Sequence, residues 1–170
     1  MADREIIIRE KLTHEGIFDF SALYSYAHAW FQEEQYNGVD EERYSEKVSG
    51  NKRNLLIDWI ATKNYSEYFK IELKINFKIS NLTDVEVEID NQKKKMNKGS
   101  IEINVKGTLI KDPDSKWESS PFTRFTREIY NKFIIPARVL NVKNKVSDHS
   151  QRFKDDIKAL LELSGRRYRE

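Results

Sequence analysis

The chain has 170 residues, of which 38% are hydrophobic and 34% are charged, with a net charge of +2 and no cysteine. This length suits one domain with its own hydrophobic core, and the lack of cysteine excludes disulfides, zinc–thiolate sites and cysteine nucleophiles. Apolar runs stay well below the roughly 20 residues of a membrane span, so we expect a cytoplasmic protein with no such span. We predict one domain over residues 1–163 and a basic tail over residues 164–170.

Charge is distributed unevenly along the chain. Residues 1–50 hold 5 basic and 11 acidic side chains, whereas residues 121–170 hold 12 basic and 6 acidic ones. Two interpretations fit this asymmetry. The oppositely charged ends attract each other or occupy different solvated faces, or the basic C-terminal third meets an acidic partner.

The first part of the chain predicts a strand, a helix and two further strands. Residues 5–12 form the first predicted strand. Asp19 is the predicted N-cap of a helix over residues 19–36, because its carboxylate can accept a hydrogen bond from an otherwise unpaired backbone N–H. Residues 44–48 and 55–62 then predict two strands.

The strongest pattern lies in residues 69–79, where apolar and polar residues alternate. The apolar positions are Phe69, Ile71, Leu73, Ile75, Phe77 and Ile79. A period of two predicts a strand with one buried and one solvent face, and it favours an antiparallel sheet because parallel strands are apolar on both faces. Residues 85–89 and 101–109 predict two more strands. We therefore expect a curved antiparallel sheet of about six strands with one solvent face.

Apolar stripes at helical spacing follow the last predicted strand. Ser120 and Pro121 are typical of a helix start. The stripe of this helix is Phe122, Phe125, Ile129 and Phe133. Pro136 must kink or break the helix, and the stripe resumes over residues 139–160. We predict an α+β fold in which the sheet packs against a long kinked C-terminal helix and one N-terminal helix.

The element order of strand, helix, about five strands and long helix resembles the helix-grip layout of the START-like superfamily. Members of that superfamily bind lipids and other hydrophobic ligands, and the resemblance implies a cavity between the curved sheet and the last helix. It covers most of the chain, although residues 38–43 are too few for the second helix of the family's usual insert. Trp59–Lys63 and Met96–Gly99 also resemble segments of small uncharacterised archaeal proteins, which implies no function.

Aromatic residues gather on the predicted inner faces. They include Trp30, Phe31, Trp59, Phe69, Phe77, Phe125 and Phe133. These rings either fill the core or line a ligand cavity, depending on whether they interdigitate. Our leading hypothesis is a non-enzymatic domain that binds a lipid-like small molecule or an amphipathic peptide in an apolar groove between sheet and C-terminal helix. The predicted groove residues are Trp59, Phe77, Tyr130 and His149.

No pattern in the sequence names a reaction. His149 lies on the apolar stripe of the last helix, which fits a core histidine with one hydrogen-bond partner or a polar group that orients a ligand. The carboxylate pairs lie on predicted solvent faces, and the glycines are isolated rather than clustered in a phosphate-binding loop. We therefore predict no enzymatic activity, no cofactor and no metal site.

Basic residues in predicted loops support an alternative function. Lysines and arginines gather at Lys52 and Arg53, at Lys93, Lys94, Lys95 and Lys98, and in the tail at Arg166, Arg167 and Arg169. They either keep hairpin ends soluble or contact an acidic partner. The alternative is an adaptor that binds nucleic acid or an acidic protein through these loops and the C-terminal helix. A homodimer through the long helix is also conceivable.

Overall fold

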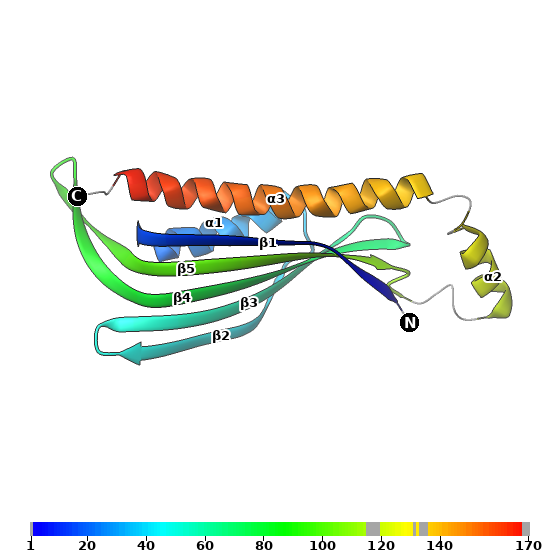
Figure 1. Ribbon diagram of the computed structural model, residues 1–170, viewed down its shortest axis with the longest axis horizontal. Helices are drawn as coiled ribbons and strands as arrows, with labels where there is room; N and C mark the ends of the chain where they lie inside the picture. The colour runs from blue at the N-terminus through cyan, green and yellow to red at the C-terminus, as the bar shows by residue number, and fades with distance from the viewer. Residues whose placement is uncertain (1, 115–119, 131, 133–135, 168–170) are drawn as a thin grey trace.

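The computed structural model describes residues 2–114, 120–130, 132 and 136–167. Its elements in chain order are β1 (Asp3–Phe18), α1 (Phe20–Glu33), β2 (Val39–Ser49), β3 (Lys52–Asn64), β4 (Phe69–Ile89), β5 (Gln92–Lys111), α2 (Pro121–Ile129) and α3 (Pro136–Arg167). The strands form one antiparallel sheet, and α3, at 1.5 Å per residue, extends along it for about 48 Å (Figure 1). The predicted α+β class, the antiparallel sheet and the long C-terminal helix are confirmed.

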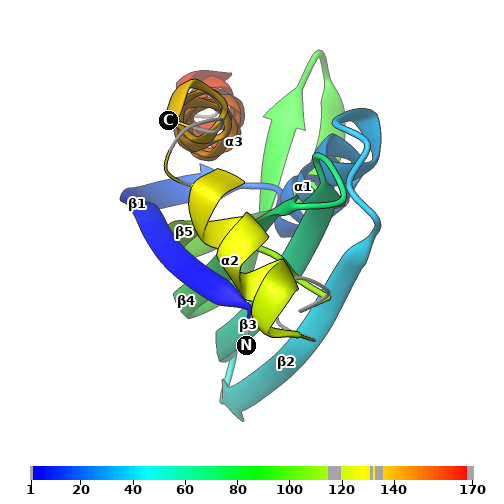
Figure 2. The ribbon, with the colours of Figure 1, turned by 90° about the vertical axis from the view of Figure 1, so that its right-hand side faces the viewer.

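The strand order is β1-β5-β4-β3-β2, with every neighbouring pair antiparallel. Since β1 and β2 form opposite edges of the sheet, the connection that contains α1 crosses one face. Both α1 and α3 lie over that face (Figure 2). We call it the covered face, and we call the opposite side of the sheet the open face.

The core lies between the covered face and the two helices. Strand alternation turns the apolar residues of β3 and β4 inward, where they are buried. Phe153 of α3 contacts Trp30 and Phe31 of α1, with ring centroids 5.2 and 5.1 Å apart. Phe153, Ile157 and Leu161 of α3 are buried in this core, and Val142 and Val146 are buried in a second apolar cluster. The predicted apolar stripe of the last helix is therefore its docking face.

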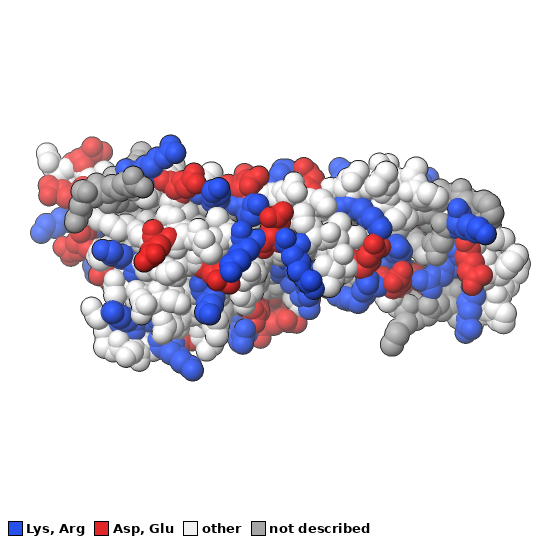
Figure 3. All heavy atoms as spheres, in the orientation of Figure 1, with Lys and Arg blue, Asp and Glu red and all other residues white. Residues whose placement is uncertain are grey.

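Ion pairs attach α3 to the acidic N-terminal part of the chain. Lys143 Nζ lies 2.7 Å from a carboxylate oxygen of Glu5, and Lys154 Nζ lies 2.8 Å from one of Glu10. The hydrogen bond from Lys143 lowers the pKa of Glu5. Figure 3 shows basic and acidic side chains side by side along the boundary between α3 and β1. The uneven charge of the sequence thus helps to dock the last helix onto the first strand.

Gly107 of β5 allows α3 to approach the sheet closely. A Cβ atom added at this position would lie 2.6 Å from both Val146 Cγ1 and Ser150 Oγ of α3. Ser150 Oγ donates a hydrogen bond of 2.8 Å to the Val146 carbonyl, so this buried hydroxyl is satisfied within the helix. The glycine interrupts the apolar alternation of the strand because the helix occupies the space of its side chain.

The sheet has five strands, close to the predicted number of about six. Residues 69–89 form one strand, although two strands were predicted there. The residues between the two predicted strands stay in the sheet, with an irregularity in the pairing between Ser80 and Thr83, where Asn81 has φ 55°. Such an irregularity bends a strand without ending its pairing. The β4–β5 hairpin accordingly curves toward the C-terminal end of α3 (Figure 1).

The lysines at 93–95 lie in a strand, because the chain turns earlier than predicted. Asp90 and Asn91, both with positive φ, form the turn between β4 and β5. Glu86 and Glu88 of β4 stand opposite Lys95 and Lys93 of β5. The acidic side of this part of β4 therefore pairs with the lysines that follow it in the chain.

Of the kink or break predicted at Pro136, the structure shows a break, and Pro136 begins a new helix rather than a kink within one. α2 ends at Ile129 and α3 begins at Pro136, and the two helices point in different directions (Figure 1). Proline suits the first turn of a helix because its missing N–H needs no partner there. As a consequence Phe125, predicted to face the core, is exposed on α2. The same prediction for Phe133 concerns a position outside the described residues.

Candidate functional site

Two of the predicted groove residues, Trp59 and Phe77, are fully buried neighbours on β3 and β4. Their rings meet edge to face with centroids 4.9 Å apart. Trp59 Nε1 and the Tyr24 hydroxyl both donate to the same oxygen of Glu41, at 2.9 and 2.6 Å. Burial and this carboxylate raise the pKa of Tyr24 to about 12. The rings of Trp59 and Phe77 both belong to the main core cluster.

The third predicted residue, His149, is buried against α1 and the turn after it. Its Nδ1 lies 2.9 Å from the hydroxyl oxygen of Tyr36, and its ring neighbours are Trp30 and Tyr36. Its Nε2 lies 4.0 Å from Glu34, whose carboxylate also accepts from Arg152 at 2.6 Å. Burial lowers the pKa of His149, although the carboxylate opposes this effect. This arrangement matches a core histidine with one hydrogen-bond partner.

The fourth predicted residue, Tyr130, lies beside a separate apolar cluster. It directly follows α2, and its ring centroid is 5.9 Å from that of Tyr68. The cluster comprises Tyr68, Phe69, Ile71, Leu109, Val142 and Val146. A pocket of about 530 Å³ opens here, between the β3–β4 connection and the start of α3. Trp59 and Phe77 therefore lie in the main core cluster, whereas Tyr130 borders the second one.

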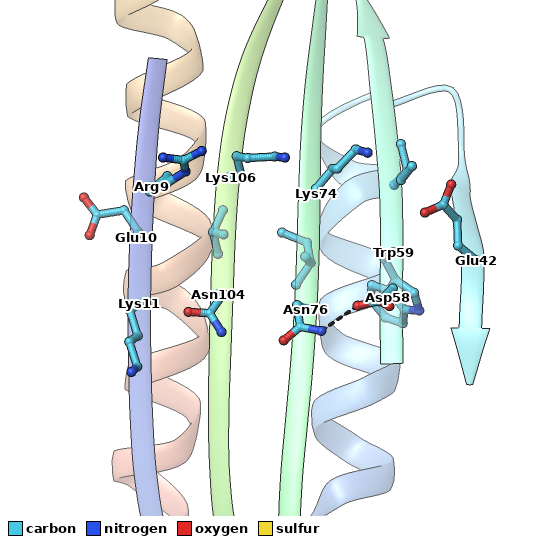
Figure 4. A pocket seen from close by; sticks show the side chains of 13 residues that line it. Arg9, Glu10, Lys11, Glu42, Asp58, Trp59, Lys74, Asn76, Asn104 and Lys106 are labelled. Atoms are coloured by element: carbon cyan, nitrogen blue, oxygen red, sulfur yellow. Dashed lines mark hydrogen bonds between the residues drawn. The ribbon is translucent and has the colours of Figure 1, made fainter. Parts of the chain in front are cut away.

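A groove of about 400 Å³ lies on the open face, where sequence reasoning placed only a solvated surface. Its polar residues come from all five strands, and most of their side chains project away from the helices, Glu10 being the exception because it pairs with Lys154 of α3 (Figure 4). The principal ones are Arg9, Lys11, Asp58, Lys74, Asn76, Asn104 and Lys106. Strand alternation produces this arrangement, because each of these residues is flanked by residues that face the core.

Three cations stand side by side across the groove. Arg9 of β1 is opposite Lys106 of β5, and Lys106 is opposite Lys74 of β4. We call these three residues the cation row, which is visible across the three strands in Figure 4. Neighbouring strands lie about 4.8 Å apart, so the row spans about 10 Å. Like charges directly opposite each other destabilise a sheet.

The next row of the open face differs because its charges are matched. Lys11 lies 3.4 Å from Glu102, and Arg43 lies 2.7 Å from Asp58. By contrast, no carboxylate within the described residues lies within 4.0 Å of a cation-row side chain. The sheet therefore holds a concentrated positive charge beside a row that is neutralised.

Sequence reasoning missed the cation row because its members are far apart in the chain. Each one is an ordinary solvent-face position within an alternating strand. Only the pairing register brings Arg9, Lys106 and Lys74 together. One signal was available in the sequence: the solvent-face positions of β4 are rich in lysine. It could have prompted a search for basic residues at matching positions of the neighbouring strands.

Comparisons with protein-family models, curated proteins and solved structures gave no match. Among the described residues, no group of three or more histidines and carboxylates is placed to hold a metal ion. Within the same residues, no helix is long and apolar enough to cross a membrane. The START-like resemblance stays a prediction, and the functional argument rests on the geometry of the chain itself.

Proposed function

We propose that the open-face groove binds a phosphate-bearing anion through the cation row. The observation that carries this proposal is the placement of Arg9, Lys106 and Lys74 directly opposite one another without a matching carboxylate. A bound anion with two or more negative charges would convert their repulsion into attraction. The guanidinium fork of arginine and the ammonium groups of lysine both suit phosphate oxygens.

The size and lining of the groove support a compact ligand. A volume of about 400 Å³ lies within the roughly 300–1,000 Å³ range of small-molecule sites. Asn76 and Asn104 supply amide groups in the adjacent row, and they are oriented by hydrogen bonds to Asp58 and Glu102. A nucleotide-sized anion, or a short stretch of nucleic-acid backbone, carries phosphates at a spacing that the row of about 10 Å can span.

Titration calorimetry tests the proposal and separates these two sources of phosphate. Pyrophosphate, a nucleoside triphosphate and a single-stranded oligonucleotide are titrated at low and high salt. Binding of the first two alone identifies a small anion. A backbone ligand gives oligonucleotide affinity that falls with salt, with a log–log slope of about −0.7 per neutralised phosphate.

A pair of double variants locates the binding. Lys74→Gln/Lys106→Gln should weaken binding roughly tenfold or more, equivalent to about 1.4 kcal/mol. The charge-matched control is Lys94→Gln/Lys145→Gln, which removes two exposed lysines outside the groove and should bind like the wild type. Equal weakening by both variants, or no binding of any probe at low salt, would contradict the proposal.

The pocket beside Tyr130 favours a second candidate, the apolar-ligand function predicted from the sequence. Its lining combines Tyr65, Tyr68, Phe69 and Val142 with the polar groups of Arg138 and Asn141. Native mass spectrometry of freshly purified protein should then reveal a co-purifying hydrophobic molecule that Tyr130→Ala reduces. Tyr26→Ala, at an exposed tyrosine of α1, is the control. A ligand-free spectrum, together with no uptake of an added fatty acid, would contradict this candidate.

A further inference from the structure

The helix α2 contributes no buried residue to the core. Ser120 caps its N-terminus by accepting from the Thr123 backbone N–H at 3.2 Å, and the Thr123 hydroxyl oxygen accepts from the Ser120 N–H at 3.0 Å. Pro121 occupies the first helical position. This reciprocal capping box satisfies backbone groups locally. None of the nine residues of α2 is buried, and the helix crosses one end of the molecule (Figure 2).

The apolar side chains of α2 form an exposed stripe. Phe122, Phe125 and Ile129 are 76%, 60% and 39% exposed. Their spacing of three and four residues places them on one side of the helix. A single exposed apolar residue needs no explanation, but a contiguous group at helical spacing indicates a docking surface. We call these three residues the α2 stripe.

Basic residues surround the α2 stripe in the sequence. Residues 120–145 contain six lysines or arginines and a single acidic residue, Glu128. Arg124 and Arg127 lie within α2 itself, and Lys132 and Arg138 follow it with exposed side chains. Since Lys143 is paired with Glu5 of β1, the five remaining cations exceed the single acidic residue of this segment by four charges, which is complementary to an anionic surface.

A second copy of the chain suits this surface poorly. A nine-residue helix is about 14 Å long, and its face is far smaller than the roughly 800 Å² per partner of a stable interface. A symmetric contact would also bring the arginines of two α2 helices together. An anionic lipid surface instead accepts the aromatic side chains at the headgroup boundary and attracts the flanking cations.

We propose that α2 docks the protein in the plane of an anionic lipid surface, with Phe122 and Phe125 inserted at the headgroup boundary. Binding by one short helix is weak and reversible, because only two aromatic side chains are inserted. The cation row lies on the open face of the sheet rather than at α2, so this interaction is separate from the proposed anion binding.

Flotation with lipid vesicles tests the inference. Full-length protein is mixed with vesicles of phosphatidylcholine alone, or of phosphatidylcholine with about 30% phosphatidylserine. Binding to the anionic vesicles should exceed binding to the neutral ones at low salt and should fall as salt screens the attraction. Failure of the wild type to float with anionic vesicles at low salt would overturn the proposal.

Matched variants assign the binding to α2. Phe122→Gln/Phe125→Gln should reduce the vesicle-bound fraction at least fivefold, and it should keep the wild-type circular dichroism spectrum because both side chains are exposed. Leu163→Gln, at a 58% exposed leucine near the other end of α3, should bind like the wild type.

Two further measurements separate the alternatives. Lys74→Gln/Lys106→Gln should keep vesicle binding, whereas its loss in this variant but not in the phenylalanine variant would assign the interaction to the groove and overturn the proposal. Light scattering compares wild type with Phe122→Gln/Phe125→Gln. A wild-type dimer that this variant converts to a monomer would identify the stripe as a self-interface and would equally overturn it, whereas unchanged mass supports lipid docking.

Discussion

The two faces of the sheet are built from the same strands but have opposite properties. On β4, Phe77 faces the helices and is buried, whereas Lys74 and Lys78 face the other way. The covered face is filled by apolar and aromatic side chains, and the open face holds the polar groove. Since alternate residues serve the two faces, stability and binding can be changed independently by substitutions only one position apart in the sequence.

Phe77→Ala should have the largest effect on stability. Removing a buried aromatic ring leaves a cavity beside Trp59 and should lower the free energy of unfolding by about 3–5 kcal/mol. The adjacent open-face substitution, Lys78→Ala, should change it by no more than about 0.5 kcal/mol. Urea unfolding followed by circular dichroism measures both. Similar losses of unfolding free energy at the two positions would mean that stability does not depend more on the covered face than on the open face.

Gly107→Ala tests the contact between the covered face and α3. The new methyl group would lie 2.6 Å from Val146 Cγ1 and Ser150 Oγ, so these side chains or the helix that carries them must shift. We expect a loss of about 1–3 kcal/mol in the free energy of unfolding, as is typical of overpacking.

Gly165→Ala on α3 is the matched control for that substitution. Its Cβ would lie 3.4 Å from His14 Cε1, and its backbone needs no positive φ. It should be neutral or stabilise the protein by up to about 1 kcal/mol. Thermal unfolding of both variants decides the comparison, and a neutral Gly107→Ala would show that α3 is not tightly apposed to β5.

Sequence reasoning predicted the covered face better than the open one. The strict alternation of residues 69–79 and the stripe of the last helix depend on local periodicity, which is readable without a structure. The merging of two predicted strands at Asn81 was missed, and at Pro136 the single kinked helix was expected where the structure has a break and a new helix start. Asn81, which usually interrupts a strand, is accommodated by a bulge. Pro136, which usually interrupts a helix, is accommodated in the first turn of α3.

The candidate sites depended on information that periodicity does not contain. Trp59 and His149 were identified as inner-face residues, but nothing in their spacing shows that Trp59 contacts Phe77 while His149 bonds to Tyr36. The cation row required the register of three strands, which depends on turns and irregularities distant from it. Exposure of the α2 stripe followed from the separation of α2 from α3.

On the covered side, we expect His149 to have a smaller, pH-dependent effect on the free energy of unfolding. Because its folded-state pKa is lowered, the unfolded chain binds its proton first as pH falls. The contribution of this residue to stability is therefore complete above about pH 6.5 and is lost as pH falls from there toward the folded-state pKa. Glu34 and Asp148 oppose the lowering of this pKa, while Lys63 and Arg152 favour it.

His149→Gln should reduce the change in unfolding free energy between neutral pH and about pH 5.5, whatever its effect on stability at neutral pH. The pKa of His14 is also lowered by burial, so the double variant with His14→Gln should flatten the profile further. Urea unfolding at a series of pH values provides the measurement. An unchanged slope in His149→Gln would show that the ring carries the same proton in the folded and unfolded states.

Lys106→Gln should have the smallest effect, and its sign is the sharpest test of the comparison between faces. Lys106 stands between Arg9 and Lys74, so its neutralisation removes both opposed like charges. The free energy of unfolding should rise by about 0.2–1 kcal/mol, and the gain should shrink at high salt. Lys94→Gln, opposite the uncharged Val87, should show no such gain. Pyrophosphate should stabilise the wild type more than Lys106→Gln, because at a given ligand concentration the tighter-binding protein gains more stability, by RT ln(1 + [L]/Kd). A loss of stability in Lys106→Gln without ligand would mean that the row is held by attraction already present in the fold, and that no anion is needed to balance it.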